Sequence, residues 1–172
     1  MELKPQDIVV ALKLVALDGE NLSMQKLGVL LGLSSSRIHE SLHRLNRANL
    51  SSNMLGGFRP MKANLEEFLL HGIKYAFVPE IGEFTRGIPT ASYAPPLNNA
   101  FADSNEPPYV WPDAEGEVRG VSFSPLHKCV PKAIRQDQAL YELLALVDAI
   151  RAGRARDRKM AAEEISKRLS TT

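Results

Sequence analysis

The sequence predicts a mainly α-helical protein with a small β component, organised in three consecutive parts. Apolar residues recur at helical spacing near both ends of the 172-residue chain. Nine of the eleven prolines lie between Pro79 and Pro131, which disfavours long helices there. Eight of the eleven aromatic residues lie between Tyr75 and Phe123, which is unlike a disordered linker. We therefore expect a helical head over residues 1–74, an irregular segment with short strands over 75–135 and a helical region over 136–172.

The composition excludes several classes of protein. A hydrophobic fraction of 44% and a charged fraction of 24% are close to the globular average, which excludes wholesale disorder. No stretch approaches the roughly 20 apolar residues that span a bilayer, so no membrane partner is expected. The residues from Met1 to Asp7 lack the features of a signal peptide. Because Cys129 is the only cysteine, no intrachain disulfide can form, and we expect a cytoplasmic protein.

The net charge of +1 is small, but its distribution is uneven. Two mildly basic ends flank an acidic middle segment. This falls short of a strongly basic nucleic-acid binder. Any interaction with DNA must therefore depend on where individual charges lie.

Four helices are expected in the head. Pro5 suits the first position of a helix over residues 5–17, whose apolar face includes Ile8 and Leu12. The following helices are expected over residues 23–31, 34–49 and 60–71.

The middle and the end of the chain are expected to differ from the head. A hairpin is expected over residues 75–85, and the stretch 98–108 is the best candidate for a mobile loop. A last helical region begins near Gln136, and Gly153 is expected to kink it.

Residues 23–49 have the pattern of two helices joined by a tight turn. Small Gly28 allows close approach of the second helix, Gly32 takes the turn and Ser34 caps the second helix. The inner face of that second helix is formed by three apolar residues, Ile38, Leu42 and Leu45. The stretch 31–45, LGLSSSRIHESLHRL, resembles the turn and recognition helix of winged helix-turn-helix transcriptional regulators. The resemblance covers roughly residues 5–50.

The resemblance implies that the outer face of the second helix binds double-stranded DNA. Arg37 is the candidate for a bidentate contact to guanine. The three serines at the helix start are expected to hold a phosphate, and Arg44 and Arg47 to contact the DNA backbone. Arg59 and Lys62 are expected to add to the phosphate contacts. The full set of candidate DNA-binding residues is Ser34, Ser35, Ser36, Arg37, His39, His43, Arg44 and Arg47.

A wing normally follows the recognition helix, but residues 50–58 leave room only for a stub. Residues 51–57 are polar and rich in glycine, which predicts a turn or a very short hairpin. Either the wing is degenerate, or the expected hairpin around residues 75–86 takes its place and brings Arg86 near the DNA backbone.

A competing interpretation treats the same helix as a zinc site. His39, Glu40 and His43 match the H-E-x-x-H pattern of zinc peptidases. The apolar side of the helix is already used for packing, and a third ligand would have to come from Glu66, Glu67 or His71. Two solvated histidines on a DNA-facing helix are the favoured interpretation, so no metal and no cofactor are expected.

Two further clusters of reactive side chains have ordinary structural explanations. The stretch from His127 to Cys129 pairs a base with a thiol, but it lies between prolines without a third partner, which favours a structural thiol. The carboxylates Asp113, Glu115 and Glu117 are typical of a solvated turn around Gly116.

The C-terminal region offers a candidate partner surface. Its leucine stripe is either core or a dimer seam, and the basic run over residues 151–159 either contacts phosphates or an acidic partner or is a solvated helix face. The candidate residues for a partner or dimer surface are Leu140, Leu143, Leu144, Val147, Arg151 and Arg154.

Together these patterns favour a non-enzymatic, sequence-specific DNA-binding regulator, a repressor that acts as a homodimer. The alternative is an antitoxin-like autoregulator or protein-interaction module that holds a partner protein through residues 75–172. The length of the part outside the head motivates this alternative.

Overall fold

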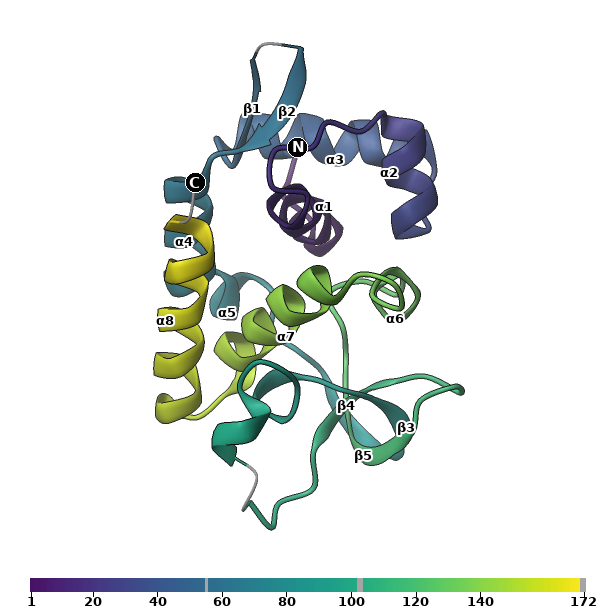
Figure 1. The fold of residues 1–172 in the computed structure, drawn as a ribbon, viewed down its shortest axis with the longest axis vertical. Helices are drawn as coiled ribbons and strands as arrows, with labels where there is room; N and C mark the ends of the chain where they lie inside the picture. The colour runs from purple at the N-terminus through teal and green to yellow at the C-terminus, as the bar shows by residue number, and fades with distance from the viewer. Residues whose placement is uncertain (55, 102–103, 171–172) are drawn as a thin grey trace.

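The computed structural model describes residues 1–54, 56–101 and 104–170. Within these ranges it is mainly α-helical with two small sheets, as the sequence predicts (Figure 1). The first part of the chain forms α1 (Pro5–Ala16), α2 (Met24–Leu31), α3 (Ser35–Arg47), β1 (Ser51–Met54), β2 (Gly57–Pro60), α4 (Lys62–His71) and α5 (Ile73–Ala76). The second part forms β3 (Ile81–Pro89), the 3-10 helices η1 (Ala91–Tyr93) and η2 (Asn98–Phe101), β4 (Tyr109–Pro112), β5 (Val118–Phe123), α6 (Val130–Ala133), α7 (Gln138–Ala152) and α8 (Ala155–Ser170).

Helix α1 is the central element, with α3 on one side and α7 on the other (Figure 1). The sequence predicts one apolar face for this helix, but every residue from Asp7 to Leu14 is buried. A helix that is covered around its whole circumference packs against neighbours on several sides. An ion pair between Lys13 and Asp137 also joins α1 to the residue that caps α7. The two ends of the chain therefore share one hydrophobic core.

The strands form two separate sheets. Strands β1 and β2 form an antiparallel hairpin in which Ser51 pairs with Pro60 and Met54 with Gly57. Strand β3 pairs antiparallel with both β4 and β5, and β4 and β5 pair in parallel, so the second sheet closes on itself. The second sheet lies beyond α7, at the end of the molecule opposite β1 and β2 (Figure 1).

The hairpin expected over residues 75–85 does not form, and that prediction was wrong. Residues 73–76 form the short helix α5 in place of a strand. In this helix Ile73 is fully buried in the core, whereas Tyr75 is exposed. The strand that follows pairs instead with β5, far along the chain. Glu80 and Ser124 close this pairing through two hydrogen bonds, of 2.7 Å and 3.0 Å. Local sequence pattern alone could not identify so distant a partner.

The leucine stripe of α7 belongs to the core. Leu140, Leu143, Leu144 and Val147 are at most 4% exposed, because α7 packs against α1, α5 and α8. Of the two alternatives for this stripe, the structure supports core packing, and the dimer seam was wrong.

The break between α7 and α8 lies where the sequence predicts a kink. A Cβ atom on Gly153 would stand 2.1 Å from the Ala149 carbonyl oxygen, so this close approach requires glycine. Residues 98–101 of the expected mobile loop form η2, whereas residues 102 and 103 lie outside the described residues. Among the described helices, none is long and apolar enough to cross a membrane.

Candidate nucleic-acid interface

Local chemistry fixes the turn between α2 and α3. Gly32 adopts a left-handed conformation with φ of +70°, which ends α2. A Cβ atom on Gly28 would stand 2.4 Å from the Leu33 carbonyl oxygen, so only glycine allows the chain to pass here. The Ser34 hydroxyl then accepts a hydrogen bond from the Arg37 backbone N–H at 3.3 Å and caps α3. The two helices are therefore joined as the sequence predicts.

Helix α3 has one fully buried face and one exposed face. Ile38, Leu42 and Leu45 have no exposed surface, because they pack against α1 and α2. Seven of the eight candidate DNA-binding residues remain exposed, and these are Ser34, Ser35, Ser36, Arg37, His39, His43 and Arg47. Most of the predicted contact set therefore lies on one accessible flank of the helix.

Arg44 is the exception, and its predicted contact with the DNA backbone was wrong. The side chain is 7% exposed and makes two hydrogen bonds to the fully buried carboxylate of Asp7, at 2.8 Å and 2.9 Å. The hydrogen bond with Asp7 raises the pKa of Arg44. Because both oxygens of Asp7 need this partner, Arg44 holds α3 against α1 and is not free for phosphate contacts.

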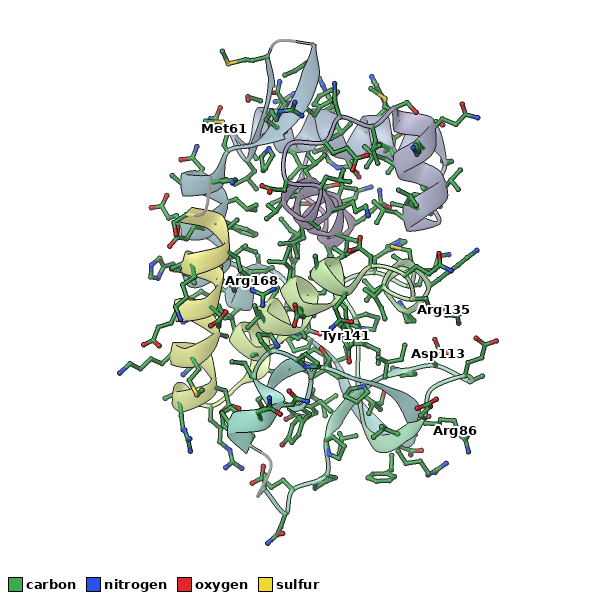
Figure 2. The ribbon with its side chains drawn as sticks, viewed as in Figure 1. Met61, Arg86, Asp113, Arg135, Tyr141 and Arg168 are labelled. Carbon is green, nitrogen blue, oxygen red and sulfur yellow. The ribbon has the colours of Figure 1, made fainter. Side chains whose placement is uncertain are left out.

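A short hairpin follows α3 directly, which agrees with the turn or very short hairpin that the sequence predicts for residues 51–57. Residues 51–60 form β1 and β2, and the hairpin projects from the end of α3 (Figure 1). Leu50 anchors its base, because its carbonyl accepts a hydrogen bond from the Met61 N–H at 2.9 Å. Arg59 is exposed on β2. Arg86, the residue expected near the DNA backbone, lies on β3 at the far end of the molecule (Figure 2).

Among the described residues, the histidines of α3 belong to no metal-binding cluster. His39 and His43 are both exposed. No three His, Cys, Asp or Glu side chains gather as a possible metal site within the described ranges. Glu66, one of the proposed third ligands, instead accepts a hydrogen bond from Ser166 at 2.6 Å. The zinc-peptidase interpretation therefore lacks a third zinc ligand among the described residues.

The stretch from His127 to Cys129 lies against the same surface. His127, Lys128 and Arg37 line one groove of about 510 Å³. Burial, together with the positive charges of Arg37 and Lys128, lowers the pKa of His127. Burial raises the pKa of the Cys129 thiol to about 11, so the thiol is uncharged at neutral pH and is a poor nucleophile. Sequence reasoning missed this segment as part of the α3 surface, because it is about 90 residues away in the chain.

The predicted carboxylate turn forms a local structure. The Asp113 carboxylate accepts a hydrogen bond from the Glu115 N–H at 2.8 Å, and the Gly116 N–H bonds to the Asp113 carbonyl at 3.0 Å. Arg135 forms ion pairs with both Asp113 and Glu115. The turn is therefore held by its own hydrogen bonds, as is typical of a surface loop.

Arg151 is buried, so its assignment to a partner surface was wrong. Its guanidinium donates hydrogen bonds to Asp148 at 2.8 Å and to the Phe77 carbonyl at 2.9 Å. Asp148 also accepts hydrogen bonds from Thr90 and Trp111, both at 2.7 Å. This cluster joins α7 to the ends of α5, β3 and β4. Its role is to hold these elements together.

Arg154 is the one candidate partner residue that is exposed. It pairs with Glu106 beside a cavity of about 660 Å³. The cavity is lined partly by aromatic side chains, including Tyr93 and Tyr109. It lies at the junction of α7 and α8, away from α3.

Comparisons with protein-family models, with curated proteins and with solved structures found no match.

Proposed function

We propose that this protein is a sequence-specific DNA-binding transcriptional regulator that reads DNA through α3. The observation that carries the proposal is the two-sided character of this helix. Its apolar face is completely buried, while Arg37, His39, His43 and Arg47 remain exposed on the other face. A helix held in this way is free to enter the major groove of DNA.

Neighbouring elements support this orientation. The tight turn at Gly32 and the cap at Ser34 fix the start of α3, the part that meets base edges in helix-turn-helix proteins. The β1–β2 hairpin projects next to its other end and carries exposed Arg59. In this arrangement Arg37 contacts a base, and Arg47 and Arg59 contact phosphates.

The proposal includes action as a homodimer, since two reading heads match a two-fold operator. The α7 stripe does not form the dimer surface, because it is buried within one chain. Light scattering of the pure protein, alone and with DNA, measures the oligomeric state.

The direct test is binding of the pure protein to the DNA upstream of its own gene, titrated against salt. We expect binding that exceeds binding to unrelated DNA and weakens steeply as salt rises. Equal affinity for the upstream DNA and for unrelated DNA would contradict sequence-specific regulation.

A second candidate function is capture of a partner protein. It is favoured by four large apolar side chains that are at least half exposed within ten residues, namely Tyr75, Val78, Ile81 and Phe84. They lie within residues 75–172, the part expected to hold a partner. A stoichiometric partner that remains bound at high salt would support this function, and a lone salt-sensitive DNA complex would favour the plain regulator.

A further inference from the structure

We infer that Lys128 and Lys132 bind DNA phosphates beside α3, so that the DNA surface includes a segment from the second half of the chain. The inference rests on the proposed function, because it extends the same surface. It names two binding residues that do not belong to the helical head.

The segment from Pro125 to Ala133 is fixed against the reading surface. Leu126, Cys129, Val130 and Ala133 are at most 8% exposed and belong to the common core. A local backbone hydrogen bond of 3.0 Å, from the Val130 N–H to the His127 carbonyl, also holds this segment in place. The anchored apolar residues alternate with exposed lysines, so the lysines are held at the surface.

Both lysines lie next to the start of α3. Lys128 and Arg37 line the same groove, which runs between the beginning of α1, α3 and the 126–128 segment. Helix α6, which contains Lys132, packs against α2. The Lys132 Cδ atom stands 4.0 Å from the position that a Cβ atom on Gly32 would take, in the turn before α3. The two lysines therefore flank the part of α3 that is proposed to meet base edges.

The charges of the groove favour an anion. Arg44 in its floor is matched by Asp7, so it adds no free charge. Glu40 is the remaining carboxylate of the groove and lies 3.9 Å from Arg44. Lys4, Arg37, Lys128 and Lys132 form no ion pair with any described residue. Unpaired cations at the edge of a base-reading helix are suited to the phosphates on either side of the groove.

The test is a salt titration of the double variant Lys128→Gln and Lys132→Gln on the upstream DNA and on unrelated DNA. Loss of two phosphate contacts should lower the slope of log affinity against log salt by about 1.8. Affinity should fall roughly tenfold at low salt, and by similar factors on both DNAs, because phosphates carry no base sequence. An unchanged slope, or a loss confined to the upstream DNA, would overturn the inference.

A matched control removes two charges elsewhere. Arg86 and Arg119 are cross-strand partners on β3 and β5, and both are exposed. Arg86 lies far from α3 (Figure 2). Arg86→Gln with Arg119→Gln should leave the slope at the wild-type value, and an equal reduction would show a general charge effect that overturns the inference. The double variant Lys128→Arg and Lys132→Arg keeps both positive charges, so its salt slope should equal that of the wild-type protein. This variant should also unfold at the wild-type temperature.

The outcomes separate this inference from the proposed function. If the wild-type protein does not bind DNA, the proposed function fails. If the wild-type protein binds DNA and the glutamine variant binds with the same affinity and the same salt slope, only the inference about phosphates fails.

Discussion

Helices α3 and α7 are of similar length, 13 and 15 residues, and each combines a stripe of leucine and other aliphatic residues with at least one arginine. In α3 the side opposite the stripe is exposed, except at Arg44. In α7 every residue from Leu143 to Arg151 is buried. The difference arises because α7 is enclosed by α1, α5 and α8, whereas α3 packs against α1, α2 and β1 and keeps an exposed flank.

This comparison shows that an arginine on a helix indicates a surface only when no buried acid lies within reach. Arg44 meets Asp7, and Arg151 meets Asp148, and both pairs are buried. Arg47, one turn after Arg44, has no such partner and stays exposed. A buried cation of this kind is kept because its carboxylate would otherwise be left uncompensated.

The largest effect is expected from Arg44→Ala. Removal of the guanidinium leaves the buried carboxylate of Asp7 without its partner, so the free energy of unfolding should fall by about 3–5 kcal/mol. Urea denaturation measures the change. Arg47→Ala is the matched control and should alter stability by at most about 0.5 kcal/mol, since its side chain is exposed. Similar small losses in both variants would show that Arg44 is not structural.

Leu144→Ala tests whether α7 is core or interface. The side chain is 1% exposed, so the substitution leaves a cavity and should cost about 2–5 kcal/mol of unfolding free energy. The oligomeric state of the folded variant should be unchanged. If the variant has wild-type stability but dissociates into monomers, the α7 stripe would be a dimer interface and not part of the core.

Arg37→Ala addresses base reading by α3. Loss of a bidentate contact should weaken specific binding by about 1–3 kcal/mol and relax the preference at one base pair. Binding to a set of operators with single base changes measures this. Wild-type sequence preference in the variant would exclude Arg37 as a base-reading residue.

Arg47→Ala should have the smallest effect of these four. As a phosphate contact, Arg47 should contribute to all DNA sequences alike, and its loss should lower the salt slope by about 0.9. A loss restricted to one base pair would mean that the roles of Arg37 and Arg47 are reversed.

Local sequence was sufficient to predict the α2–α3 unit. Gly28, Gly32 and Ser34 act on residues close to them in the chain, and the leucine spacing fixes which face is buried. The expected helix starts and ends therefore agree with α1, α2 and α3 to within about two residues.

Interactions between distant residues could not be predicted in this way. The burial of Arg44 depends on Asp7, 37 positions earlier, and β3 pairs with a strand that begins at Val118. The extent of the hairpin after α3 was predicted only in part: the sequence predicts a turn or very short hairpin over residues 51–57, whereas β2 continues to Pro60, because short, partly polar strands show little alternation of apolar and polar residues. The groove beside Arg37 likewise requires a segment from the other half of the chain.

Cross-linking from the exposed flank of α3 tests the central claim most directly. A photoreactive group on Ser36→Cys should cross-link to bound upstream DNA, whereas the same group on Glu163→Cys, exposed on α8, should not. Native Cys129 is buried and its thiol has a raised pKa, so it competes little for the reagent. Cross-links from position 163 with none from position 36 would contradict DNA binding through α3.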